Sequence, residues 1–167
     1  LLLLEDAPFN LGSLSSLLKI SFFKVISVSP VKYLFSWDDI KYIRAVQEIN
    51  ANNDPSKVAF NTSRRELENY LHPESINEAY IANGGQCNLT TIDPQDDVPT
   101  LVAEHTYTLS GGNWEELEIE KKKKKSDSKK KLLNTQAVEL MTLERLKETG
   151  GYDEIKSWFE QIKVSAN

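Results

Sequence analysis

The chain has 167 residues, of which 40% are hydrophobic and 27% are charged. This length and hydrophobic content are sufficient for one domain with its own core. The single cysteine, Cys87, excludes a disulfide framework and a zinc site built from several cysteines. Lysines and a proline interrupt the apolar stretch 14–35, which argues against a membrane span. Because no signal-peptide pattern is visible, we expect a cytoplasmic protein.

Positive charge is concentrated in one run of the sequence. Residues 121–131 contain eight lysines and one aspartate, which is a net charge of +7. The whole chain carries −5, so the remaining residues carry −12. This layout is expected where metal-binding carboxylates and a phosphate-attracting patch share one protein. A solvated loop of lysines between two helices is the alternative.

The first half of the chain alternates between strand and helix patterns. Short apolar runs predict strands, and apolar residues at helical spacing predict helices. The expected strands are 1–5, 22–28, 31–35 and 57–60, and the expected helices are 11–20, 38–50 and 66–71, the last extended through 73–81. Such alternation predicts an α/β fold with a mainly parallel sheet flanked by helices.

The second half has the pattern of a helical C-terminal extension. Residues 101–109 fit either a helix or a strand, and further helices are expected at 114–125, 132–147 and 152–162. The predicted parts are an α/β domain over 1–110, a charged linker or helix with the lysine run over 111–131, and a helical hairpin over 132–167.

The last helix has an apolar face that includes Ile155, Trp158 and Phe159. We expect this face to pack against the preceding helix after a turn at Gly150-Gly151. Removal of a buried Trp158 side chain would then cost about 3–5 kcal/mol.

A polar segment, R-R-E-L-E-N-Y-L-H-P, runs from Arg64 to Pro73 after the strand at 57–60. In open α/β sheets, ligands and catalytic groups collect at the carboxyl ends of the strands. An ordinary helix N-terminus is the alternative, with Ser63 as the cap and Glu66 completing a capping box. Both interpretations can hold, because the helix determines where the charged side chains point.

The stretch R-E-L-E-N-Y-L-H-P resembles the TOPRIM (topoisomerase–primase) domain of the overcoming-lysogenization-defect (OLD) family of ATP-dependent endonucleases. Further blocks resemble that domain in the same order. They are D-D-V-P-T-L-V-A-E at 96–104, K-K-L-L-N-T-Q-A-V-E-L-M-T at 130–142 and the tail D-E-I-K-S-W-F-E-Q-I at 153–162. The resemblance covers residues 57–163, and more loosely residues 1–50.

The resemblance implies a TOPRIM-like domain that cleaves phosphodiester bonds in DNA with Mg²⁺ or Mn²⁺, in a site that can hold two metal ions. TOPRIM sites take a Glu from the end of the first strand and an Asp-x-Asp pair from a later strand. Carboxylate oxygens are the ligands that such hard ions prefer, and a lysine would stabilise charge in the transition state. The candidate metal ligands are Glu5, Asp38, Glu66 and Glu68, and the candidate catalytic residues are Glu66, Lys130 and Lys131.

The early acidic positions differ from the family pattern. Asp6 stands where the family has a glycine, and Phe9 stands where it has an acid. The Asp-x-Asp pair becomes Ser36-x-Asp38 or the adjacent pair Asp38-Asp39, whose side chains would point to opposite faces of a strand. A catalytically inactive TOPRIM-like scaffold that binds DNA or a partner ATPase therefore stays open beside the endonuclease.

Other functional signatures are absent from the sequence. No G-x-x-x-x-G-K-[ST] phosphate-binding loop occurs, so we expect a nuclease-type domain without its ATPase half, or a fragment of a longer chain. His72 and His105 lack the spacing of metal ligands. The partners implied by the resemblance are DNA and an ABC-type ATPase domain or subunit, with a homo-oligomer allowed and no membrane. The implied role is anti-phage defence.

Overall fold

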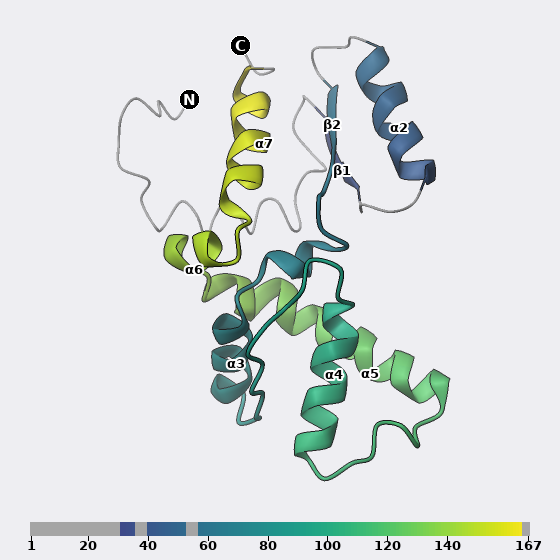
Figure 1. Ribbon diagram of the computed structural model, residues 1–167, viewed down its shortest axis with the longest axis vertical. Coiled ribbons are helices and arrows are strands. Elements are labelled where there is room, and N and C mark those ends of the chain that lie inside the picture. The colour runs from purple at the N-terminus through teal and green to yellow at the C-terminus, as the bar shows by residue number, and fades with distance from the viewer. Residues whose placement is uncertain (1–30, 36–39, 53–56, 165–167) are drawn as a thin grey trace.

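The computed structural model describes residues 31–35, 40–52 and 57–164 (Figure 1). Strands β1 (Val31–Phe35) and β2 (Lys57–Asn61) form a parallel pair, and helix α2 (Ile40–Ala51) lies between them in the sequence. The side chain of Asn50 at the end of α2 exchanges two hydrogen bonds of 3.0 Å with the backbone of Ala59. These bonds satisfy backbone groups of β2 and hold α2 against the strand.

From Leu67 onward, every regular element of the described chain is a helix. These elements are η1 (Leu67–Tyr70), α3 (Pro73–Ala82), α4 (Val98–Leu109), α5 (Ile119–Leu132), η2 (Leu133–Ala137), α6 (Leu143–Glu148) and α7 (Tyr152–Val164). The π-helical turn η2 continues α5 without a break, so the two form one long helix. Figure 1 shows α4 beside this long helix, and the strands with α2 at the opposite end of the molecule from the tip of α4.

The prediction of a mainly parallel sheet is wrong. The described segments are mostly helical, and the sheet that they contain has only two strands, β1 and β2. After Asn61 the apolar residues recur at helical spacing, and Pro73 and Pro99 stand in the first turns of α3 and α4. Proline suits the first turn of a helix and removes a donor that a sheet would need, so this half of the chain adds helices instead of strands.

Several element predictions are confirmed individually. The strands 31–35 and 57–60 and the helices 38–50 and 152–162 are present with small changes at their ends. The ambiguous segment 101–109 belongs to α4, because the Asp97 side chain accepts a hydrogen bond from the Thr100 N–H and caps that helix. The elements expected at 1–5, 11–20 and 22–28 lie outside the described residues. The three-part division stays a prediction, and the long helix crosses its boundary at residue 131.

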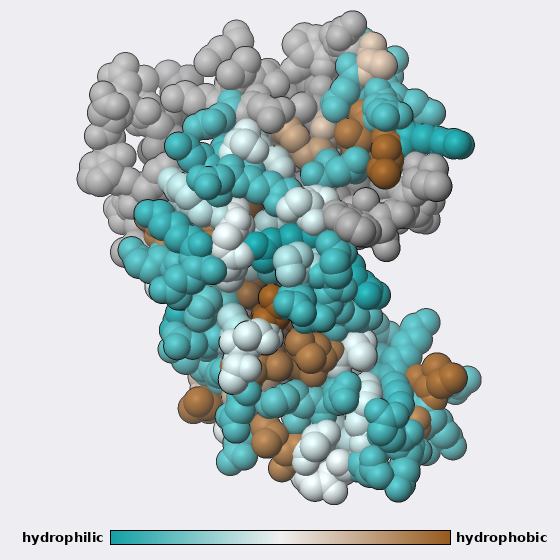
Figure 2. All heavy atoms as spheres, in the orientation of Figure 1, coloured by the Kyte–Doolittle hydropathy of each residue, from teal (hydrophilic) through white to brown (hydrophobic). Residues whose placement is uncertain are grey.

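The hydrophobic core lies among α3, α4 and the long helix. Its fully buried members include Ile76 and Ala79 of α3, Val98 and Val102 of α4, and Leu133, Ala137 and Val138 of the long helix. The loop between α3 and α4 adds Cys87 and Leu89. Figure 2 shows a mostly hydrophilic face, with apolar atoms visible in a zone in the lower half of the molecule. No helix of the described segments is long and apolar enough to cross a bilayer.

Helix α7 packs its aromatic face against residues from far upstream in the chain. The Trp158 ring meets the Tyr70 ring edge-on at a centroid distance of 5.6 Å and the Phe60 ring at 6.5 Å. Ile155 is buried, whereas Trp158 is half-buried. The sequence predicted packing against the preceding helix. Helix α7 does contact α6, and Trp158 in addition joins α7 to β2 and η1.

We expect Trp158→Ala to lower the free energy of unfolding by about 2 kcal/mol, less than a fully buried aromatic residue would lose. The reason is that Trp158 keeps part of its surface in water while it covers Tyr70. Chemical denaturation measures the change. The control is Lys156→Ala, since Lys156 is exposed on the same helix and should cost at most about 0.5 kcal/mol. Equal losses in the two variants would contradict the packing described here.

Candidate functional site

The candidate site forms where η1, the start of α4 and the long helix meet. Glu66 immediately precedes η1, Glu68 belongs to it, and Asp97 caps α4. Lys130 comes from α5, and its charge acts on Glu66 together with the charges of Glu68, Asp97 and Arg65. The site therefore brings together carboxylates from the middle of the chain and a lysine from its second half.

The fully buried side chain of Asn69 holds Glu66 in place. Its Oδ1 accepts the backbone N–H of Glu66 at 2.9 Å. Its Nδ2 donates to the carbonyl oxygens of Asp93 at 2.8 Å and Asp96 at 3.0 Å. Both N–H donors of the buried Asn69 amide are therefore hydrogen-bonded. One side chain thereby connects the turn that carries Glu66 to the loop before α4.

The π-helical turn η2 places Asn134 beside Glu68. The Asn134 Nδ2 donates to Glu68 Oε1 at 2.9 Å, and Glu68 is only 8% exposed. The Oδ1 atom of Asn134 is buried and has no hydrogen-bond partner. Turns of this type are rare and occur often at functional sites, because they redirect side chains relative to the helix before them.

Glu66 lies in surroundings that disfavour its negative charge. Burial raises the pKa of its carboxyl, the charge of Glu68 raises it further, and Lys130 partly opposes both effects. Its Oε2 atom is buried without a hydrogen-bond partner. A proton or a cation near Glu66 would relieve this cost, so the site is suited to proton transfer or cation binding.

The two arginines of the polar segment have different roles. Arg65 forms an ion pair with Asp97 at 3.3 Å. Arg64 is buried, with its guanidinium 4.7 Å from the centre of the Tyr70 ring. It donates to the carbonyl oxygens of Asn69, at 2.6 Å, and of Thr149. Arg64 therefore joins η1 to the turn before α7.

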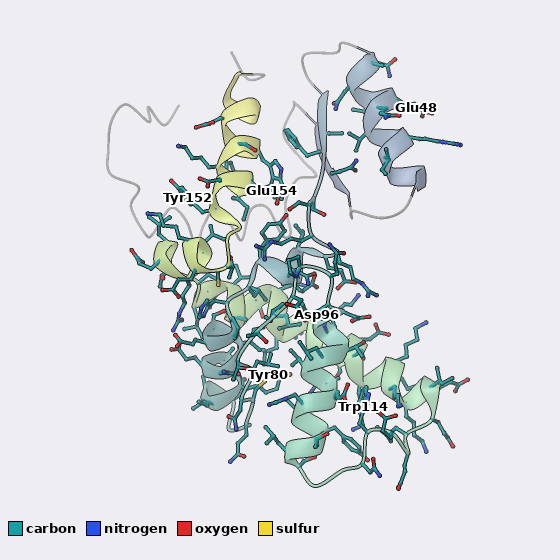
Figure 3. The ribbon with its side chains drawn as sticks, in the orientation of Figure 1. Glu48, Tyr80, Asp96, Trp114, Tyr152 and Glu154 are labelled. Atoms are coloured by element: carbon teal, nitrogen blue, oxygen red, sulfur yellow. The ribbon has the colours of Figure 1, made fainter. Side chains whose placement is uncertain are left out.

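Ser63 does not cap a helix as predicted. The 3₁₀ helix η1 begins later, with Glu66 at its N-cap position. Both the N–H and the hydroxyl of Ser63 donate to the carboxylate of Glu154, which also accepts the Tyr70 hydroxyl at 2.7 Å. Figure 3 shows Glu154 on α7. Burial and the Glu154 carboxylate raise the pKa of the Tyr70 phenol.

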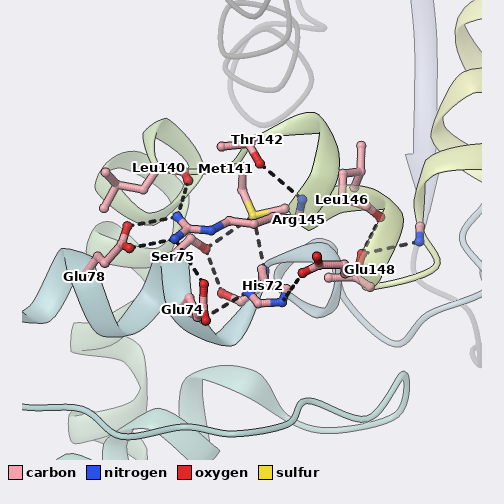
Figure 4. A network of polar contacts seen from close by, with 12 residues as sticks. His72, Glu74, Ser75, Glu78, Leu140, Met141, Thr142, Arg145, Leu146 and Glu148 are labelled. Atoms are coloured by element: carbon pink, nitrogen blue, oxygen red, sulfur yellow. Dashed lines mark hydrogen bonds and ion pairs between the residues drawn. The ribbon is translucent and has the colours of Figure 1, made fainter.

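His72 belongs to a separate network that joins α3 to α6 (Figure 4). Its Nε2 lies 3.2 Å from a carboxylate oxygen of Glu148, and its backbone N–H donates to the Met141 sulfur. In the same network Arg145 binds both carboxylate oxygens of Glu78, at 2.6 and 2.9 Å, and one of Glu74. His72 is therefore a structural residue at the junction of α3 and α6.

The structure brings together three of the predicted site residues, Glu66, Glu68 and Lys130. Lys131 is exposed on the next position of α5, and Glu5 and Asp38 lie outside the described residues. Sequence reasoning missed Asn69, Asn134 and Asp97. The only sequence signal among these was Asp97, whose position before Pro99 is typical of a helix cap.

The site of the described segments is incomplete as a metal site. Nowhere in those segments do three His, Cys, Asp or Glu side chains form a group that could hold a metal ion. Glu66, Glu68 and Asn134 offer two carboxylates and one amide oxygen, so a tightly held ion would need further ligands. No protein-family model, no curated protein and no solved structure matches the chain.

We expect Glu66→Gln to raise the melting temperature at neutral pH. The carboxyl has a raised pKa in the folded chain, so its ionisation above the ordinary value of 4.5 opposes folding. The advantage of glutamine should therefore shrink as the pH falls through the raised pKa of the folded chain and vanish below 4.5, where the carboxyl is protonated in both states. Thermal melts across this range measure it.

Glu116→Gln is the matched control for this measurement. Glu116 is exposed, and its contact with Asn113 persists with an amide. A melting temperature of Glu66→Gln that is lower than wild type at neutral pH would contradict the electrostatics of the site.

Proposed function

We propose that the chain is a metal-dependent DNA endonuclease without its ATPase half, with Glu66, Glu68 and Lys130 at its centre. The observation that carries this proposal is the meeting of these three residues at one site. They come from separate blocks of the resemblance. Asn134, on the same long helix as Lys130, donates to Glu68 at 2.9 Å, and the charges of Glu68 and Lys130 both act on Glu66. A carboxylate pair next to a lysine is suited to phosphodiester chemistry, which needs cation binding and stabilisation of added negative charge.

The site offers buried oxygen acceptors that a divalent cation could bind. The oxygens Oε2 of Glu66 and Oδ1 of Asn134 are buried acceptors without donors, and hard cations prefer such oxygens. Bound Mg²⁺ or Mn²⁺ would supply Lewis-acid chemistry at neutral pH. Glu5 and Asp38 are proposed as further ligands, because two carboxylates and an amide do not complete a site.

Each residue of the centre has a proposed role. Glu66, whose pKa is raised by burial and by Glu68, is proposed as the general base. Asn134 holds Glu68 by a hydrogen bond of 2.9 Å. Lys130 would stabilise the charge that develops on the phosphate. The proposal depends on these residues and not on a parallel sheet. The resemblance to the OLD family extends it to a cytoplasmic role in anti-phage defence beside an ABC-type ATPase.

A second candidate function is DNA binding without cleavage. The observation that favours it is the exposure of lysines along α5, next to a site with few metal ligands in the described part of the chain. Such a scaffold would bind DNA with a steep dependence on salt and without a requirement for metal. It would act by holding DNA or a partner ATPase.

We expect the chain to nick supercoiled plasmid in the presence of Mn²⁺. Glu66→Ala should lower the rate by about 100-fold or more, the usual contribution of a general base, and Lys130→Gln should also lower it. Glu116→Ala, a change at an exposed acid of the loop before α5, should leave the rate unchanged. Nicking that persists in Glu66→Ala would remove Glu66 from the mechanism.

Calorimetric titration with Mn²⁺ separates the two functions. The endonuclease predicts binding that weakens in Glu68→Gln, because a carboxylate ligand is lost. The scaffold predicts no Mn²⁺ binding together with intact DNA binding. Absence of both Mn²⁺ binding and nicking would overturn the endonuclease.

A further inference from the structure

The lysines of α5 divide into two groups with different surroundings. Three of them lie over aromatic rings on the side of α5 that faces α3 and α4. The Nζ atoms of Lys122, Lys125 and Lys129 lie 5.6, 4.2 and 5.3 Å from the ring centres of Trp114, Tyr107 and Tyr80. We call these three the inner lysines. Their spacing of three and four residues places them on one face of the helix.

The inner lysines have a structural role. They are partly buried, and burial lowers the pKa of Lys129. On the same face Ser126 is buried, and its hydroxyl accepts a 2.9 Å hydrogen bond from the hydroxyl of Thr100 of α4. Lysines in this position cover apolar surface with their methylene chains and interact with the ring faces through their charge. The inner lysines therefore hold α5 against α3, α4 and the loop before α5, and their ammonium groups are engaged with the rings and not free to bind a ligand.

The remaining lysines of the run lie on the outside. Lys123, Lys124, Lys130 and Lys131 are exposed, and we call them the outer strip. In the described segments no ion pair forms at Lys123, Lys124 or Lys131, whereas Lys121 pairs with Glu118 at 3.3 Å.

The outer strip is positive and free of apolar residues. At 100° per residue, positions 124 and 131 lie about 20° apart around the helix, and positions 123 and 130 lie about 100° and 120° from position 124. Glu120 and Asp127 share this side, so four lysines and two carboxylates leave a net charge of +2. No apolar residue occurs between positions 120 and 131. A membrane-binding helix would need an apolar side facing outward, and the apolar side of the long helix faces the core.

We propose that the outer strip binds the phosphate backbone of DNA and leads it to Glu66. This inference rests on the proposed function, because it assigns the surface that holds the DNA. Lys124 and Lys131 are separated by about 10.5 Å along the helix at 1.5 Å per residue. That length corresponds to about three phosphates of one strand at 3.4 Å per nucleotide. Asn134, about one turn beyond Lys130 on the same long helix, donates to Glu68 at 2.9 Å, and the charge of Lys130 acts on Glu66, so a strand along α5 reaches the acidic site.

Two triple variants with the same change in charge test this assignment. The outer variant is Lys123→Gln, Lys124→Gln and Lys131→Gln, and the inner variant is Lys122→Gln, Lys125→Gln and Lys129→Gln. Fluorescence anisotropy with a short labelled DNA duplex, measured over a range of salt concentrations, gives the affinity and its salt dependence. The outer variant should lose about tenfold or more in affinity, and its slope of log K against log salt should fall by about 2 to 3.

The inner variant should lose stability but keep its affinity for DNA. Its melting temperature should fall, while its affinity and slope at a temperature where it is folded should stay within about twofold of wild type, because no phosphate contact is removed. If the triple inner variant does not fold, two single variants make the same comparison. They are Lys125→Gln for the inner lysines and Lys124→Gln for the outer strip. Asp127→Asn should increase the affinity, since it removes a negative charge from the strip.

The possible failures are distinguishable. Equal losses in the outer and inner variants would overturn the assignment, because only net charge would then matter. Unchanged DNA binding in the outer variant would overturn it too, and would leave the proposed function intact. Competition by polyglutamate as strong as that by DNA, or binding to anionic vesicles at the same salt, would show a different partner and overturn it. No binding of DNA by the wild-type chain would overturn this inference and the proposed function together.

Discussion

The buried amide of Asn69 is the contact on which the middle of this protein depends. It satisfies one backbone donor before η1 and two backbone carbonyls of the loop before α4. Each of these groups would otherwise be left without a partner in a region that excludes water, at a cost of about 1–3 kcal/mol. No apolar residue could replace Asn69, because three backbone groups would lose their bonds at once.

The acidic site is a consequence of this contact. A 3₁₀ turn of four residues has little stability of its own, so the direction of Glu66 and Glu68 comes from what holds the turn at both ends. Asn69 holds it to the loop before α4, Arg64 holds it to the turn before α7, and Asn134 holds Glu68 from the long helix. The positions of the two carboxylates are therefore set by two amides and one guanidinium that bind the turn from other segments.

Local patterns in the sequence identified much of the secondary structure but little of the way in which it assembles. Strand β2 and helix α7 were readable because an apolar run and an amphipathic face are properties of neighbouring residues. The parallel sheet was over-predicted, since the alternation of strand and helix patterns was taken to predict a sheet domain through residue 110, whereas the described chain is helical after Asn61. Glu66, Glu68 and Lys130 were candidates because of the resemblance, and in the structure the charges of Glu68 and Lys130 act on Glu66. The part played by Asn134 had no local signature, because it depends on a π-helical turn and on a contact between distant segments.

The long helix also determines which charges the protein shows to solvent. Because α5 and η2 are continuous, the rotation of the lysines about the helix axis is fixed by the core residues Leu133 and Val138 further along the same rod. One residue inserted or deleted between the lysines and these core positions would turn the run by about 100°. Lysines that now cover aromatic rings would then face water, and exposed ones would turn toward α4. The surface pattern of this protein can thus change in evolution through helix length alone, with its amino-acid composition almost untouched.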